Sequence, residues 1–168
     1  MSKLLSRYAI MFAVLMALQL LVLNNINLGG YINPYIYILF IMLLPFEIPG
    51  WILLIFGFLT GLIIDAFSGT LGLHSSATLF IAFIRPTILS NISTHDSVDR
   101  KGSPSLVIND IGWFIKYTLI IVLIHHFILF YLETFTFVHF FFTLFRIILS
   151  TIITSIFILL SQLFFFNK

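Results

Sequence analysis

The chain alternates long apolar runs with short polar stretches, and this pattern is its most informative feature. Each run is long enough for a helix, and a helix needs about 20 residues to cross the hydrocarbon core of a bilayer. The run at 33–46 is short for a span, which favours a tilted helix or a locally thinned bilayer. The pattern therefore predicts an all-α polytopic membrane protein with six transmembrane helices. We expect these helices at about 5–23, 33–46, 50–66, 72–91, 111–132 and 137–166.

The composition indicates that lipid is the solvent for most of the chain. Of 168 residues, 61% are hydrophobic and 8% are charged, and the mean hydropathy is +1.17. A soluble fold of this size leaves too much surface exposed to hide so many apolar side chains. Six helices use about 120 residues. The sequence therefore predicts a single transmembrane domain over 1–168 and leaves no room for a separate soluble catalytic domain.

The basic residues lie on one side of the predicted bundle. The loops at 24–34, 67–71 and 133–136 contain no Lys or Arg. Because Lys and Arg are enriched in cytoplasmic loops, this asymmetry predicts that both termini are cytoplasmic. A net charge of +2 is too small to indicate nucleic acid as a partner. The basic residues on the predicted cytoplasmic side are Lys3, Arg7, Arg100, Lys101, Lys116 and Lys168.

Small residues recur at four-residue spacing on two of the predicted helices. Gly57 and Gly61 form a GxxxG face that ends in Asp65, and such a face lets another helix approach closely. A weaker repeat of alanines on the first predicted helix serves either internal packing or the docking of a separate subunit, and we favour internal packing. The alanines of this repeat are Ala9, Ala13 and Ala17.

Ionisable side chains at membrane depth are costly and are functional candidates by default. His74, Glu133 and Arg146 each lie on a polar seam of their predicted helix, and such seams should face protein or water rather than lipid. We hypothesise that Asp65 pairs with Arg146, with His74 or Glu133 nearby, because an unpaired buried charge is strongly unfavourable. We expect Arg85 to extend its long stem to the cytoplasmic headgroups. We favour a role in holding the bundle together over a substrate pathway or partner docking.

The turn between the second and third predicted helices carries Pro45, Glu47 and Pro49. Two prolines make it stiff, and we interpret it as a tight cytoplasmic hairpin rather than as a fixed acidic surface for a partner. The chain has no zinc-protease, nucleophile-elbow or P-loop motif and no cysteine. We therefore predict a protein that is not an enzyme, with no catalytic residue, cofactor or metal site.

The stretch 27–86 carries a resemblance to a known family. It contains LGGYINPY at 28–35, LLPFEIPGW at 43–51, GFLTGLIIDAFSGTLGLHSSA at 57–77 and FIRP at 83–86. These segments resemble the rod shape-determining protein MreD family, in particular its Bacteroidetes form. The turn from Gly61 through Asp65 to Gly72 is the most family-like element. The resemblance implies a scaffold in the bacterial inner membrane that maintains rod cell shape.

The same resemblance implies particular partners. MreD-like proteins bind MreC, a single-span protein with a large external domain, and through it they influence peptidoglycan synthases in step with the MreB filament. We therefore expect an MreC-like partner here, surrounded by membrane lipid.

The MreD family is also similar in fold to the substrate-binding components of energy-coupling-factor vitamin transporters, in which six helices surround an outward-facing cavity. Those components dock through an Ala-x-x-x-Ala pattern on their first helix, which the alanine repeat fits. The alternative is thus a transport component that binds a vitamin-like small molecule. Its polar cavity would be lined by aromatic residues such as Tyr31, Tyr35 and Trp51.

Overall fold

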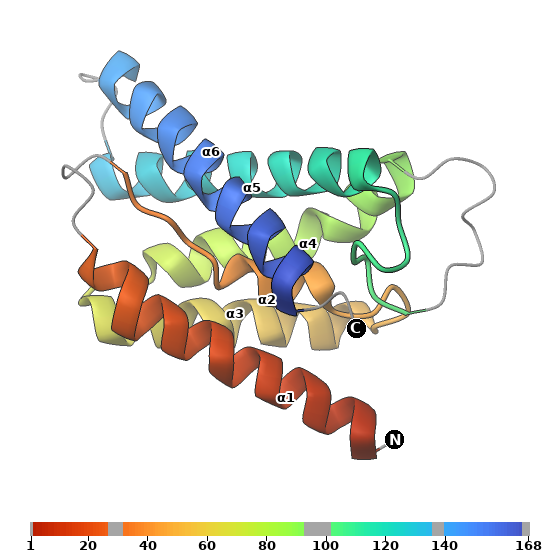
Figure 1. The fold of residues 1–168 in the computed structure, drawn as a ribbon. Helices are drawn as coiled ribbons and strands as arrows, with labels where there is room; N and C mark the ends of the chain where they lie inside the picture. The colour runs from red at the N-terminus through yellow and green to blue at the C-terminus, as the bar shows by residue number, and fades with distance from the viewer. Residues whose placement is uncertain (1, 27–31, 93–101, 136–139, 166–168) are drawn as a thin grey trace.

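The computed structural model describes residues 2–26, 32–92, 102–135 and 140–165, and the chain there is mainly helical (Figure 1). The first helix, α1, continues into a π-helical turn, η1, and a short 3₁₀ turn, η2. Five further α-helices follow. The bounds are α1 Ser2–Ala17, η1 Leu18–Val22, η2 Leu23–Asn25, α2 Ile38–Leu43, α3 Gly50–Ser68, α4 Leu73–Ile92, α5 Ile111–Thr134 and α6 Phe140–Phe165.

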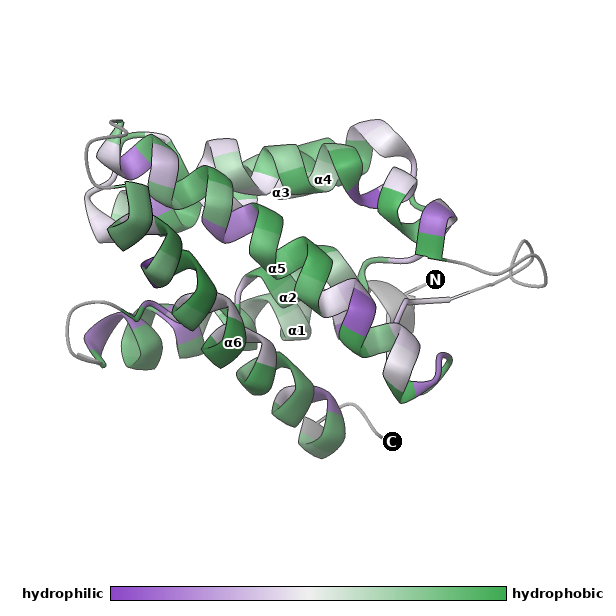
Figure 2. Ribbon diagram, turned by 90° about the horizontal axis from the view of Figure 1, so that it is seen from above, coloured by the Kyte–Doolittle hydropathy of each residue, from purple (hydrophilic) through white to green (hydrophobic). Residues whose placement is uncertain are grey.

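Within the described residues, four helical stretches are long and apolar enough to cross a membrane: Ser6–Asn25, Gly50–Ser68, Ile111–Thr134 and Phe140–Phe164. The first of these runs through α1, η1 and η2. α4 also has 20 residues, but a larger share of its side chains is polar than in these four stretches. Hydrophobic residues dominate the long helices (Figure 2), and many of their large apolar side chains are exposed. The chain is therefore an all-α polytopic membrane protein, as the apolar runs predict.

The predicted helix over 33–46 is wrong in its extent. Only Ile38–Leu43 is α-helical, and the chain from Asn33 to Tyr37 is irregular. All six residues of α2 are buried, with 0–3% of their surface exposed. The apolar character of this run reflects burial among other helices rather than contact with lipid. Irregular backbone is tolerated at membrane depth where surrounding protein supplies its hydrogen-bond partners.

Successive elements run back and forth between two ends of the bundle (Figure 1). The start of α1, the end of α6 and the turn between α2 and α3 lie at one end, which we call the terminal end. The end of α1, the α3–α4 turn and the junction of α5 with α6 lie at the other, which we call the cavity end. α3 packs against α4, α4 against α5 and α5 against α6, while α2 contacts α1, α3, α4 and α5. The short helix α2 is therefore the centre of the bundle.

The GxxxG face of α3 packs directly against α4. A Cβ added to Gly57 would lie 2.6 Å from the Cβ of Ala82, and one added to Gly61 would overlap the backbone of His74 and Ser75. These two glycines therefore allow an approach that larger side chains would prevent. The face is an internal packing face, and it brings the end of α3 against the first turn of α4.

Candidate functional site

Asp65 lies at the cavity end, where α3 finishes beside the start of α4. Its Oδ1 accepts hydrogen bonds from the Thr70 hydroxyl at 2.6 Å and from the backbone N–H of His74 at 3.0 Å. Its Oδ2 accepts from the backbone N–H of Ser75 at 2.9 Å. The carboxylate thus satisfies free N–H groups at the positive end of α4. The hypothesis that Asp65 pairs with Arg146 is wrong, because a helix N-terminus provides the compensating charge instead.

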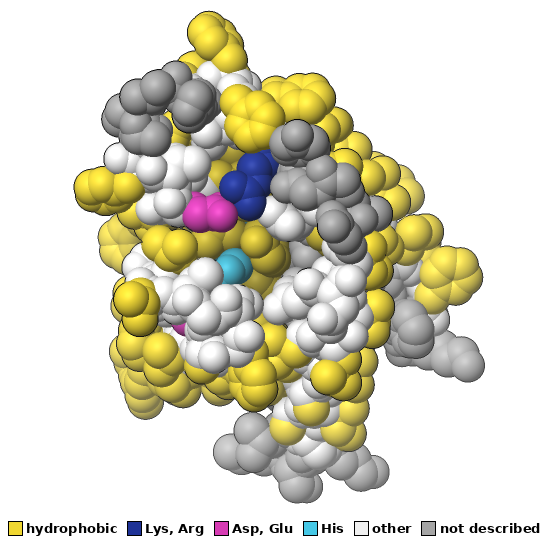
Figure 3. Space-filling model, turned by 90° about the vertical axis from the view of Figure 1, so that its left-hand side faces the viewer, with side chains coloured by type: hydrophobic (Ala, Val, Ile, Leu, Met, Phe, Trp, Pro, Cys, Tyr) yellow, Lys and Arg dark blue, Asp and Glu magenta, His cyan; other side chains and the backbone are white. Residues whose placement is uncertain are grey.

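Arg146 on α6 pairs with Glu133 near the end of α5. The Arg146 Nη1 lies 2.9 Å from the Glu133 Oε2, and the two side chains are 18% and 42% exposed. The guanidinium also lies 4.2 Å from the centroid of the Phe130 ring, which adds a cation–π contact. This is the one ion pair among the described residues, and Figure 3 shows the two oppositely charged side chains in contact at the cavity end. It joins α5 to α6.

Arg85 is buried, with 1% of its surface exposed, so the expectation that it extends to the headgroups is wrong. Its Nη2 donates to the backbone carbonyls of Met42 and Leu44, and its Nε donates to the Tyr117 hydroxyl at 3.2 Å. That hydroxyl donates in turn to the Met42 carbonyl at 3.1 Å. The last carbonyls of a helix lack partners within it and carry the negative end of its dipole. Arg85 therefore caps the C-terminus of α2.

The irregular chain before α2 is held by side chains of η1 and α6. The hydroxyls of Ser150 and Thr154 accept from the backbone N–H groups of residues 33 and 35, both at 3.1 Å. Gln19 accepts from the N–H of Ile36 at 2.8 Å and donates to the carbonyl of Pro34 at 3.1 Å. Ser150 and Thr154 of α6 therefore satisfy backbone groups of this irregular segment, which is a structural role.

Sequence reasoning missed Gln19, Tyr37 and Tyr117. Gln19 carries a signal that could have identified it, since it is the one amide side chain in the apolar run 5–23. It is completely buried, and a buried amide needs hydrogen-bond partners. The tyrosines carry no comparable signal, because tyrosine is also common in cores and at membrane interfaces.

A chain of hydrogen bonds leads from the cavity end into the core. The Tyr37 hydroxyl lies 2.9 Å from the Nδ1 of His74 and 2.9 Å from the Nε2 of His125. His126 instead bonds to the Val122 carbonyl through its Nδ1 at 2.8 Å. Because a hydroxyl has a single proton to donate, the Tyr37 hydroxyl couples the tautomers of His74 and His125.

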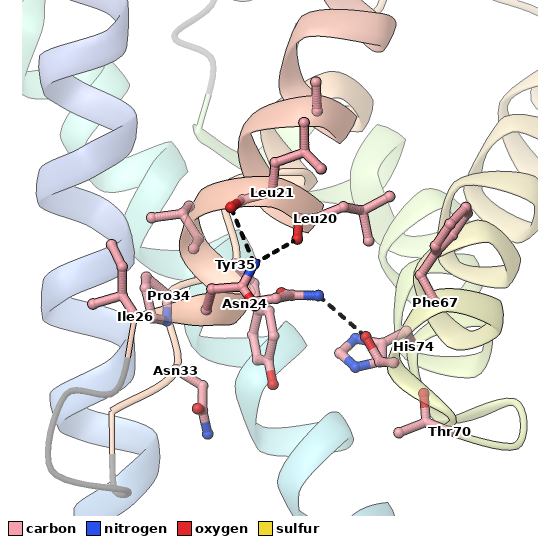
Figure 4. Close-up of a pocket in the computed structure, with 14 residues that line it drawn as sticks. Leu20, Leu21, Asn24, Ile26, Asn33, Pro34, Tyr35, Phe67, Thr70 and His74 are labelled. Carbon is pink, nitrogen blue, oxygen red and sulfur yellow. Dashed lines mark hydrogen bonds between the residues drawn. The ribbon is translucent and has the colours of Figure 1, made fainter.

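A cavity of about 650 Å³ lies at the cavity end, between the end of α1, the segment 33–35 and the α3–α4 turn (Figure 4). Figure 3 shows the hollow from this end, with a histidine ring at its floor. His74 lines the cavity, as Figure 4 shows. Apolar side chains, including Leu20, Leu21 and Phe67, form part of the wall.

Several polar side chains in the cavity have groups without a hydrogen-bond partner among the described residues. Among these groups are the Nε2 of His74, the hydroxyl of Tyr35 and the side-chain amide of Asn33 (Figure 4). No Asp, Glu, Lys or Arg lines the cavity. The described part of the chain also holds no group of three or more His, Cys, Asp or Glu placed to bind a metal. The arrangement can therefore form hydrogen bonds to an uncharged molecule.

The alanine repeat of α1 faces outward. Ala9, Ala13 and Ala17 are all exposed, so the expectation that this repeat serves internal packing is wrong. Their neighbours Ile10 and Val14 are also exposed, at 64% and 56%. This side of α1 is thus an uncovered apolar surface with a shallow line of small residues.

The remaining predicted positions lie apart from the cavity. Glu47 and Pro49 are exposed in the α2–α3 turn, and Pro45 is half-buried. The N–H of Phe46 in this turn donates to the Gly102 carbonyl at 2.8 Å, which ties the turn to the chain before α5. Trp51 is 66% exposed and does not line the cavity, whereas Tyr35 does. Tyr31 lies outside the described residues.

Comparison of the chain with protein families, with characterised proteins and with solved structures gives no match.

Proposed function

We propose that this chain is a non-enzymatic membrane scaffold of the MreD type, which binds an MreC-like single-span protein and so regulates peptidoglycan synthesis. The observation that supports this most is the outward-facing alanine repeat on α1. The charged side chains inside the bundle and the amide of Gln19 are engaged with backbone groups or with each other. The exposed surface of the helices is therefore the part of the molecule best suited to a partner.

In this proposal all six passes of the chain cross the inner membrane, including α4 and the broken segment around α2. The terminal end faces the cytoplasm, because the loops of the cavity end carry no Lys or Arg. The broken segment is compatible with a span because neighbouring side chains satisfy its backbone. The cavity end then faces the side on which an external partner domain would lie.

The mechanism is the docking of one helix against another. Helices associate in lipid through close van der Waals packing, and small residues let the two backbones approach. α1 lies at the edge of the bundle (Figure 1), so a partner's transmembrane helix can lie along Ala9, Ala13 and Ala17 without displacing another helix. A partner bound in this way is positioned relative to the rest of the cell-wall machinery.

Co-purification in detergent tests the proposal. An affinity-tagged chain should retain a single-span protein with a large external domain, identified by mass spectrometry. The variant Ala13→Leu should reduce the recovered partner by roughly tenfold, since it fills the line of small residues. Ala66→Leu is the matched control, because Ala66 is an exposed alanine on α3.

Equal recovery of the partner with Ala13→Leu and Ala66→Leu would contradict docking at α1. In the native organism, loss of the protein should round the cells. A rod shape that persists after clean deletion contradicts the scaffold function itself.

The cavity of about 650 Å³ favours a second candidate, a small-molecule-binding component of a membrane transporter. Its size lies within the range of about 300–1,000 Å³ that is typical of ligand sites. This candidate expects α1 to dock on the membrane subunit of a transporter rather than on a single-span protein. The identity of the co-purified partner therefore distinguishes the two functions.

A further inference from the structure

We propose that the cavity binds an uncharged small molecule that carries amide or hydroxyl groups. This inference extends the second candidate function and does not depend on partner docking at α1. It stands on the size of the cavity, the absence of charged groups in its wall, and three polar side chains that line it. Each of these points restricts the ligand in a different way.

The lining excludes a strongly charged ligand. No Asp, Glu, Lys or Arg lines the cavity, and an ion moved out of water without a partner of opposite charge is strongly disfavoured. Asp65, the nearby carboxylate, already accepts three hydrogen bonds from the α3–α4 turn and the start of α4. Arg146 is paired with Glu133. An anionic headgroup or a nucleotide therefore has no ready counter-charge.

The free polar groups come from two separate parts of the fold. Asn33 and Tyr35 belong to the irregular segment before α2, while His74 belongs to the first turn of α4. Figure 4 shows the side chains of these residues around the same space. Together they offer an amide, a hydroxyl and a ring nitrogen, which can serve a ligand that both donates and accepts hydrogen bonds. Leu20, Leu21 and Phe67 provide an apolar wall for a ring or a carbon skeleton.

The backbone of Asn33 and Tyr35 and the ring of His74 are also held in place before any ligand arrives. The backbone N–H groups of Asn33 and Tyr35 donate to hydroxyls of α6 at 3.1 Å. The His74 ring bonds to Tyr37 at 2.9 Å, and its backbone N–H bonds to Asp65 at 3.0 Å. A site whose side chains are fixed in advance loses less conformational freedom on binding. The contacts that hold the irregular segment before α2 therefore also position the residues of the cavity wall.

Binding to the detergent-purified full chain tests the inference with matched pairs of small molecules. The uncharged probes are nicotinamide, thymidine and N-acetylglucosamine. Their charged counterparts are nicotinate, thymidine monophosphate and N-acetylglucosamine 6-phosphate. At least one uncharged probe should raise the unfolding temperature in a saturable manner, and its charged counterpart should bind about tenfold more weakly or worse.

Tyr35→Phe removes one hydroxyl from the cavity and keeps the backbone hydrogen bond of residue 35. It should weaken the binding of that probe by about threefold to tenfold, the usual effect of one lost hydrogen bond. Tyr8→Phe is the matched control, since Tyr8 lies in the first half of α1 and is not part of the cavity wall. Its probe affinity should equal that of the wild type.

Three results would overturn the inference: no stabilisation by any uncharged probe up to about 10 mM, equal binding of a charged counterpart, or an unchanged affinity in Tyr35→Phe. The amount of co-purified single-span partner is measured on the same preparations. Loss of probe binding with the partner retained rejects the ligand site alone. Loss of the partner with probe binding retained rejects the scaffold alone.

Discussion

At the scale of single residues, polar side chains inside this bundle mainly serve the backbone. Asp65 caps the start of α4, and Arg85 caps the end of α2. Gln19 binds a backbone carbonyl and a backbone N–H of the irregular chain before α2. The interior of a helix satisfies its own backbone, whereas helix ends and irregular segments need partners from elsewhere. Gln19, Ser150 and Thr154 are therefore explained by the irregular segment before α2. Asp65 and Arg85 are explained by the ends of α4 and α2.

Asp65 should contribute more to stability than Glu133. Asp65→Ala removes three hydrogen bonds at a buried helix N-terminus and should lower the free energy of unfolding by about 1–3 kcal/mol. Glu133→Ala breaks a partly exposed ion pair and should lower it by less than about 1 kcal/mol. Denaturant unfolding in detergent measures both variants. A larger loss for Glu133→Ala than for Asp65→Ala would contradict the assignment.

Arg85 should be replaceable neither by an apolar side chain nor fully by lysine. Arg85→Met leaves the Met42 and Leu44 carbonyls without their charged donor and should lower the free energy of unfolding by about 2–4 kcal/mol. Arg85→Lys keeps the charge but lacks the fork of donors, so it should restore only part of the loss. The same unfolding assay measures both. Equal stability of Arg85→Met and the wild type would show that the cap is unimportant.

At the scale of elements, the sequence predicts the long helices well and the short one poorly. α3, α4 and α5 each lie within two residues of the ranges expected from their apolar runs. The run at 33–46 is also apolar, but its residues 36–44 are buried, so its hydropathy says nothing about whether it is helical. The side-chain pairs were less predictable. Spacing shows which face of a helix Asp65 or Arg146 occupies, but the partner depends on how helices are placed in space.

The α3–α4 interface should depend on one glycine. Gly61→Ala places a Cβ against the backbone of His74 and Ser75, so the two helices must separate and the Asp65 cap must loosen. Gly50→Ala is the matched control, because a Cβ there meets no atom within 4 Å. Gly61→Ala should lower the unfolding temperature clearly, and Gly50→Ala should leave it unchanged or raise it slightly. Equal unfolding temperatures for the two variants would contradict the packing.

At the scale of the whole molecule, the proposed topology places the terminal end and the cavity end on opposite sides of a membrane. The chain has no cysteine, so single cysteines can report accessibility without background. Ser68→Cys, at the cavity end, should react with a membrane-impermeant thiol reagent in spheroplasts. Glu47→Cys, in the exposed turn at the terminal end, should react only after the membrane is opened. Labelling of Glu47→Cys in intact spheroplasts would reverse the predicted orientation.

The two candidate binding sites, the cavity and the alanine repeat, lie in different parts of the molecule. The cavity lies inside one end of the bundle, whereas the alanine repeat lies on the outer side of α1. Only Ala17 belongs to both, since it is part of the cavity wall and of the repeat. A substitution at Ala9 or Ala13 should therefore change partner docking while it leaves the cavity intact.

Photo-crosslinking from Ala13 tests the central claim most directly. A photoreactive amino acid at position 13 should crosslink in cells to a single-span membrane protein with a large external domain. The same group at Leu62, an exposed position on α3, should not. This result would place the partner's helix along α1. A crosslink from Leu62 but not from Ala13, or crosslinks from position 13 only to lipid, would contradict the proposed scaffold.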